Sequence, residues 1–257
     1  MGRMWRGLAA ADGPTGGEAV GPCLNCGTPL MGVYCHQCGQ PADTRPITWR
    51  SLRFDHYRAF WRLDSEIGRT ARALVTDPGG FCREYVQGRR RGRTAPVTYF
   101  LTSFFVSFLL LSADRWLFHD SRAAQGSATP LESQLGVLGA AFVWAIAQRL
   151  VFRRSGFTAP ELAVCTLYLF GQLNLVSAAM LFATGPIHEF WPGARSLLAG
   201  VALAAVFWYL THFTSRLHRL SMRRSLAGTL AVTVVFLLIS VPCLMAWAVA
   251  RASWLRF

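Results

Sequence analysis

Long stretches without a charged residue constrain the fold of this 257-residue chain more than any other feature of its sequence. Crossing the hydrocarbon core of a bilayer takes about 20 apolar helical residues, and a charged side chain inside that core is costly. Five uncharged stretches follow residue 93 and hold 20, 16, 27, 20 and 26 residues, at 94–113, 133–148, 162–188, 196–215 and 225–250. They predict an all-α, polytopic membrane protein with about five transmembrane helices.

The second stretch is shorter than a bilayer requires. Its predicted span is therefore extended to Val151, with the long side chain of Arg149 reaching back to the interface. The composition agrees with a membrane protein, because 53% of the residues are hydrophobic and only 15% are charged. We expect a transmembrane domain over residues 94–257, with spans near residues 96–113, 134–151, 162–184, 196–214 and 226–250.

The distribution of arginine predicts how the chain is oriented in the membrane. All 26 basic residues are arginine; 14 precede the first span, and seven more lie at the ends of the second and fourth spans, on the same side. The opposite side carries only five. Because basic residues are enriched on the cytoplasmic side, we expect a cytoplasmic N-terminus and a periplasmic C-terminus. No secretory signal is recognised at the start of the chain, where the only apolar stretch is residues 8–11.

Four cysteines ahead of the spans predict a metal centre. Cys23, Cys26, Cys35 and Cys38 follow the spacing C-x2-C-x8-C-x2-C, and a glycine follows each pair. This pattern is typical of two tight knuckles whose thiolates converge on one tetrahedral ion. We predict a zinc-ribbon-like module over residues 21–41 with structural Zn²⁺, while iron in the same geometry and a redox dithiol stay open as alternatives.

Two further points follow from the cysteine set. The neighbouring His36 is expected outside the set of ligands, because four thiolates already complete it. A closed site with four protein ligands has no position for water or substrate, so the ion is expected to hold a fold and not to catalyse a reaction.

The segments around the cysteine module differ from it in composition. Residues 1–20 show no apolar periodicity and are predicted to form a flexible tail. Residues 47–93 are expected to form a cytoplasmic juxtamembrane segment, which ends in an arginine run, 89–93, that anchors the first span inward. Within it, residues 57–75 predict an amphipathic helix with apolar and arginine faces. The favoured position for this helix is the membrane interface; packing on the helix bundle and a partner-binding face are the alternatives.

Polar residues inside the spans are few, which argues against a proton-coupled transporter. Gln172 and Asn174 lie about 200° apart around a helix, so they cannot line the same face of a pore. Gly171, Asn174 and Ser177 or Ala178 form a stripe of small residues, which predicts helix packing in preference to a substrate site. Cys82, Cys165 and Cys243 are expected to act as small apolar side chains and not as reactive thiols.

Several short motifs in the front half of the chain occur in a recognisable order, over about residues 20–110. They are Tyr34-Cys35-His36-Gln37-Cys38-Gly39-Gln40, Leu63-Asp64-Ser65 with Arg69-Thr70, Asp77-Pro78-Gly79, Arg83-Glu84-Tyr85-Val86-Gln87-Gly88-Arg89, and Pro96. In these motifs the chain resembles a bacterial family of membrane proteins known as domain of unknown function 3667. The resemblance implies an integral membrane protein of the bacterial inner membrane with a zinc-ribbon-like head, and it implies no established activity.

The sequence favours a non-enzymatic docking, assembly or regulatory protein that binds a protein partner through its cytoplasmic head and otherwise contacts the lipid bilayer. Nucleic acid is not expected as a partner, because residues 7–44 contain no Lys or Arg and a zinc tetrathiolate is negatively charged. A transporter or channel component, assembled as a homo-oligomer, is the first alternative. A membrane enzyme acting on lipid is the second, with His119, Asp120, His188 and Glu189 as its few acid–base candidates.

Overall fold

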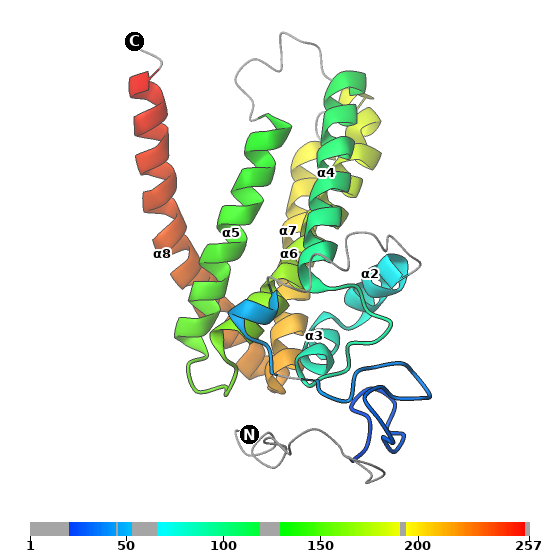
Figure 1. Cartoon of the computed structure of the whole chain (residues 1–257). Coiled ribbons are helices and arrows are strands. Elements are labelled where there is room, and N and C mark those ends of the chain that lie inside the picture. Colours follow the sequence, from blue (N-terminus) through cyan, green and yellow to red (C-terminus); the bar gives the residue numbers. More distant parts are fainter. Residues whose placement is uncertain (1–20, 45, 53–65, 119–128, 191–193, 255–257) are drawn as a thin grey trace.

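The computed structural model describes residues 21–44, 46–52, 66–118, 129–190 and 194–254, and within these the side chains of 118, 185–190, 194–196 and 247–254 are outside the description. Helices dominate the described residues, and no strand longer than an isolated bridge occurs among them. Residues 49–52 are also helical. The labelled helices (Figure 1) are α2 (Glu66–Thr76), α3 (Pro78–Val86), α4 (Pro96–Phe118), α5 (Pro130–Val151), α6 (Ala159–Phe190), α7 (Ala194–His218) and α8 (Met222–Trp254).

Five of these helices, α4 to α8, are long and apolar enough to cross a membrane, which confirms the predicted fold class. The second candidate span is a full 22 residues, Pro130–Val151, and so is longer than its uncharged stretch. Its additional residues begin with a capping box, in which Thr129 Oγ1 accepts from the Glu132 amide at 3.2 Å and the Glu132 carboxylate accepts from the Thr129 amide at 2.8 Å. Glu132 is therefore a helix-terminal residue and not a charge inside the span.

The five long helices run alternately up and down, and α6 lies at the centre of the arrangement (Figure 1). It contacts α3, α4, α5 and α7. The cysteine module, α2 and α3 lie at one end of the bundle, and the end of α8 lies at the other (Figure 1). Large apolar side chains such as Phe105, Phe142 and Leu203 are exposed on the outer faces of the long helices, as expected for surfaces that face lipid.

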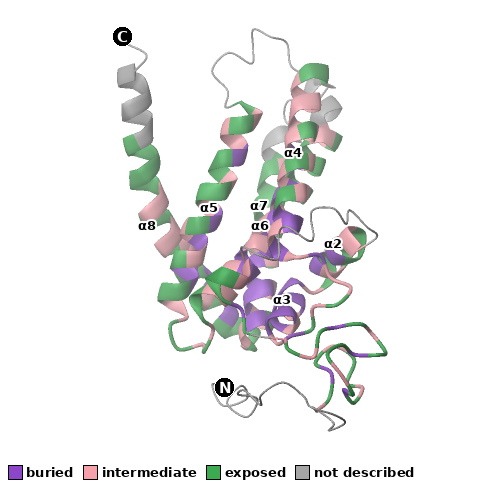
Figure 2. Ribbon diagram, viewed as in Figure 1, coloured by how far each residue is buried: buried purple, intermediate pink, exposed green. Residues whose placement is uncertain are grey.

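The buried core is concentrated at the end of the bundle that carries the module (Figure 2). Helix α3 contributes most of its residues to it, packing against α6 and α7. The rings of Phe81 and Tyr85 meet the ring of Tyr168 edge-on, with centroids 5.1 and 5.4 Å apart. These aromatic contacts fix α3 beneath the central helix.

Helix α2 also packs on the bundle. Leu74 and Thr70 are buried, whereas Arg69 and Arg72, on its other side, are exposed. The described part of the predicted amphipathic segment thus has its apolar side against protein, which was the second of the three positions considered. Residues 53–65 lie outside the described chain, and the interfacial position stays a prediction for them.

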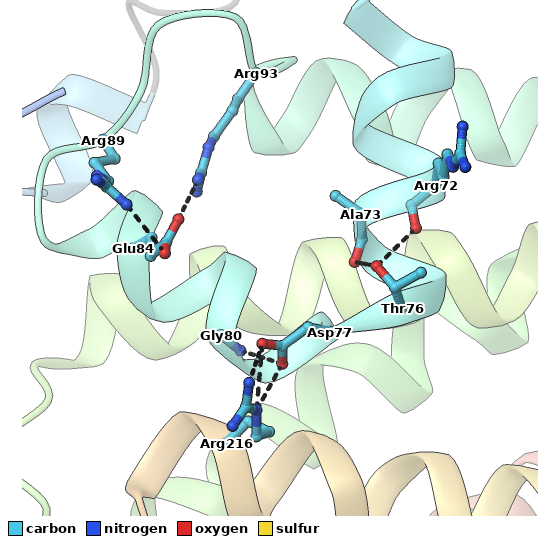
Figure 3. A network of polar contacts seen from close by, with 9 residues as sticks. All are labelled: Arg72, Ala73, Thr76, Asp77, Gly80, Glu84, Arg89, Arg93 and Arg216. Atoms are coloured by element: carbon cyan, nitrogen blue, oxygen red, sulfur yellow. Dashed lines mark hydrogen bonds and ion pairs between the residues drawn. The ribbon is translucent and has the colours of Figure 1, made fainter. Parts of the chain in front are cut away.

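The start of α3 is fixed by Asp77, which caps the helix and also binds α7 (Figure 3). Its Oδ1 accepts from the Gly80 amide at 3.0 Å, and Arg216 donates to both carboxylate oxygens at 2.9–3.2 Å. Partial burial raises the pKa of Asp77, but Arg216 and the Gly80 amide outweigh it and hold the pKa below its ordinary value. This anchor therefore stabilises the fold at neutral pH and is lost as the pH falls through the lowered pKa.

Gly79 allows α3 to approach α7 at backbone contact. A Cβ added at this position would lie 2.3 Å from the carbonyl oxygen of Phe213 and 2.7 Å from the amide nitrogen of Leu217. Both are backbone atoms, so relief would require the helices to separate.

We predict that Gly79→Ala destabilises the protein by about 1–3 kcal/mol, the usual cost of overpacking a closely packed contact. Gly68→Ala is the matched control, because Gly68 is exposed in α2 and a Cβ there meets no atom within 4 Å; it is expected to be neutral or stabilising by up to about 1 kcal/mol. Thermal melting of both variants in the same detergent measures the difference. Equal melting temperatures would show that α3 and α7 are not in close contact.

Candidate metal centre

The cysteine module consists of two knuckles that repeat the same hydrogen bonds twelve residues apart. In the first knuckle the Cys23 amide donates to the Thr28 carbonyl and the Gly27 amide to the Cys23 carbonyl, both at 2.8 Å. In the second, the Cys35 amide donates to the Gln40 carbonyl and the Gly39 amide to the Cys35 carbonyl, again at 2.8 Å. Gly27 and Gly39 adopt φ of +80° and +71°, the left-handed conformation that glycine favours.

The two knuckles bring all four predicted sulfurs together. The Sγ atoms of Cys23, Cys26, Cys35 and Cys38 lie within 4.8 Å of one another. The Cys23–Cys38 and Cys26–Cys35 separations are 3.6 and 3.5 Å, each one joining the two knuckles. Tetrahedral Zn–S bonds of about 2.3 Å place sulfurs about 3.8 Å apart, whereas a disulfide requires about 2.05 Å. The four cysteines fit a tetrathiolate metal site and not a pair of disulfides.

The four cysteine thiols have different surroundings, which shift their pKa values in different directions. Hydrogen bonds with the Thr28 hydroxyl, 3.3 Å from the Cys26 sulfur, and with the Thr28 backbone lower the pKa of Cys26 to about 6. Desolvation raises the pKa of Cys38 to about 11. A divalent cation among the four sulfurs would favour the thiolate form of all of them. His36 is exposed and does not belong to the cluster, as the sequence predicted.

The module is attached to the membrane bundle through one buried side chain, Gln40. Its Nε2 donates to the Gly88 carbonyl at 3.0 Å, and its Oε1 accepts from the Arg90 and Arg91 amides at 3.2 and 3.3 Å. The Leu24 side chain lies against Gly88 at the same junction. The arginine run expected to serve as a membrane anchor is thus also the surface on which the module sits.

Sequence reasoning did not single out Gln40 as a functional residue. A signal was present, because Gln40 follows Cys38-Gly39 at the position where Thr28 follows Cys26-Gly27. Two different polar residues at equivalent positions of a repeat indicate that the two knuckles have different neighbours. In the structure, Thr28 contacts a sulfur of its own module, whereas Gln40 contacts the bundle.

The polar residues of the spans pair with one another across helices. Gln172 accepts a hydrogen bond from the Tyr99 hydroxyl of α4, and the Asn174 amide donates to Gln134 of α5 at 2.8 Å. A Cβ at Gly171 would lie 3.2–3.3 Å from Tyr99 and Phe100, so α4 and α6 pack closely there. The side chains of Gln172 and Asn174 thus hold helices together, and the close approach at Gly171 agrees with the predicted helix packing.

The remaining candidate residues divide into two groups. Cys82 and Cys165 are fully buried in the core, which fits the role of small apolar side chains, whereas Cys243 is exposed on α8. The acid–base candidates His119 and Asp120 lie outside the described chain. His188 and Glu189 belong to α6, but their side chains are outside the description.

The fold and the site together define a multi-pass membrane protein with a four-cysteine module that can hold a metal ion. Residues 64–108 match the model of a family described as protein of unknown function, DUF3667, which confirms the resemblance over that segment. The matched residues comprise all of α2 and α3, the turn that bears the module and the first half of α4. No curated protein and no solved structure matches the chain.

We predict that Gln40→Ala detaches the module without unfolding it. The change leaves the Gly88 carbonyl and the Arg90 and Arg91 amides without their partner, at a cost of about 1–3 kcal/mol for each group that stays buried. Gln37→Ala is the matched control, since Gln37 is exposed on the same knuckle. Hydrogen exchange at residues 88–91 should accelerate in Gln40→Ala alone, while both variants retain the metal; unchanged exchange would mean that the contact does not fix the module.

Proposed function

We propose that this chain is a bacterial inner-membrane protein that serves, without catalysis, as a docking, assembly or regulatory protein through a cytoplasmic module folded by structural Zn²⁺. The observation that carries the proposal is an apolar patch on the module. Met31, Val33 and Tyr34 are 76%, 65% and 62% exposed between the two knuckles, although the neighbouring Leu30 is buried. Large apolar side chains grouped on so small a polar module mark a surface that a partner covers.

The charge of the module indicates the chemistry of that partner. Residues 21–44 contain Asp43 and no Lys or Arg, and Zn²⁺ with four thiolates adds a net charge of about −2. A protein surface with an apolar centre and basic residues around it complements such a patch. The same negative charge disfavours nucleic acid.

The geometry of the site supports a structural ion. Four thiolates close the coordination shell of Zn²⁺, so the ion would supply folding energy and no open position for a substrate. Free thiolates persist in the reducing cytosol, which agrees with an inward-facing module. The paired polar residues of α4, α5 and α6 give no support to the transporter alternative.

The first test is affinity purification of the full chain from native membranes, with metal analysis and mass spectrometry. Two variants are compared with the wild type: Cys23→Ser/Cys26→Ser, which removes two ligands, and Met31→Ser/Tyr34→Ser, which makes the patch polar. We expect one zinc per chain in the wild type and in the patch variant, and none in the cysteine variant. Both variants should lose a partner that the wild type and Gln37→Ala retain.

The patch variant separates docking from folding, because it keeps all four ligands. A partner set that is the same for all four proteins would contradict the docking role and leave the metal as a folding element only. Zinc retained by the cysteine variant would contradict the assignment of the site.

The proposed orientation is supported by arginine at the end of the bundle that carries the module. The loop after α5, with Arg153 and Arg154, and the turn between α7 and α8, with Arg219, follow helices that end there (Figure 1). We predict that a reporter active only in the periplasm is active when fused after Phe257 and inactive when fused after Arg154. An inactive fusion after Phe257 would contradict the five-span topology.

A further inference from the structure

An apolar groove of about 740 Å³ lies between α5 and α6, in the half of the bundle nearer to the module (Figure 1). Val97 of α4 and two residues of the short helix 49–52, Trp49 and Leu52, complete its wall. Figure 1 shows this short helix, in blue, beside the end of α5. The volume of the groove is in the range of small-molecule sites.

The packing of the long helices leaves the groove open towards lipid. Helix α4 packs mainly on α6 and only slightly on α5, so it does not close the space between them. Ala145 of α5 and Ala163 of α6 line the groove with small side chains that leave it unfilled. The lining residues Phe142 and Leu150 are also exposed on the outer surface of a candidate span, and such a surface faces lipid.

The lining of the groove is apolar along its length and charged at one end. Among the described residues that line it, Arg149 alone is charged. Thr166 also lines it, but its hydroxyl donates to the Leu162 carbonyl of its own helix at 2.8 Å. A surface of this kind suits a hydrocarbon chain and not a polar solute.

The length of the groove corresponds to one leaflet of a bilayer. Leu138 and Leu150 both line it, and at 1.5 Å per residue they lie about 18 Å apart along α5. Half of a hydrocarbon core about 30 Å thick is about 15 Å. Arg149 lies in the last turn of α5, at the end of the helix nearer to the module. It is therefore placed where the headgroup of a lipid chain in the groove would lie.

Two side chains at this end are typical of the membrane–water interface. Trp49 is 59% exposed although it lines the groove, and an amphipathic indole favours the level of the headgroups. The Arg149 side chain is exposed, and no carboxylate of the described residues forms an ion pair with it. An anionic headgroup would complement the charge of this guanidinium.

The dimensions also distinguish a lipid chain from a helix of a second protein. A helix about 10 Å across and about 18 Å long occupies about 1,400 Å³. That is roughly twice the volume of the groove, so a helix would not seat in it. A single acyl chain is thinner and flexible.

We propose that the groove binds an acyl chain of one anionic phospholipid, from the leaflet on the side of the module, with Arg149 bound to the phosphate. Guanidinium groups match phosphate oxygens in charge and in planar geometry. Because residues 49–52 follow the module and line the groove, the bound lipid would contact the segment that joins the module to the bundle. The inference does not depend on the docking role, since it concerns a different surface.

The test uses the full chain in nanodiscs with equal amounts of phosphatidylglycerol and phosphatidylcholine that carry the same acyl chains. Native mass spectrometry counts the lipids that each protein retains. Arg149→Gln removes the charge, and Arg154→Gln is its matched control, because Arg154 is exposed in the turn after α5 and does not line the groove. Ala145→Leu fills the groove, and Ala202→Leu is its control at an exposed position of α7.

We expect the wild type and both controls to retain one phosphatidylglycerol in preference to phosphatidylcholine. Arg149→Gln should lower this preference about fivefold, the effect of one cation beside an anionic headgroup. Ala145→Leu should lose the retained lipid. As a second readout, phosphatidylglycerol with brominated chains should quench tryptophan fluorescence less in Trp49→Phe than in the wild type, and this difference should shrink when Ala145→Leu is added.

Three results would overturn the proposal. The first is an equal lipid preference in Arg149→Gln and Arg154→Gln, and the second is unchanged lipid retention in Ala145→Leu. The third is a dimer of the wild type that Ala145→Leu abolishes, which would assign the groove to a second copy of the chain. If Ala145→Leu does not fold, the two arginine variants still decide, because both positions are exposed. None of these outcomes bears on whether the apolar patch binds a protein.

Discussion

The contact between α3 and α7 positions everything at this end of the molecule. Gly79 lets the two backbones meet, and Asp77 joins them by capping one helix and pairing with Arg216 of the other. Because the pair is partly exposed, its direct contribution to stability is modest. Its larger effect is geometric, since the turn after α3 carries the cysteine module.

The module is therefore joined to the membrane body by specific contacts as well as by the chain. Gln40 makes hydrogen bonds to three backbone groups, and Leu24 packs on Gly88. These contacts give the module a defined position relative to α3 and the start of α4.

Much of the fold was predictable, because the bilayer excludes charge and so leaves long uncharged stretches in the sequence. The start of the second span could not be predicted in this way. Glu132 belongs to the cap of α5, but a search for uncharged stretches places the start of the span after it. An amphipathic pattern shows that a helix needs an apolar neighbour, but it does not show whether that neighbour is lipid or protein. The apolar side of α2 packs against protein. The four cysteines were predictable from their spacing; Gln40 was not, because its partners are distant backbone groups that no local pattern encodes.

The position of Leu24 has one more consequence. It lies between the candidate ligands Cys23 and Cys26, and its side chain also packs on Gly88 at the junction with the bundle. A metal ion that fixes the first knuckle would therefore also fix the side chain at this junction. Occupancy of the metal site and attachment of the module would then be linked.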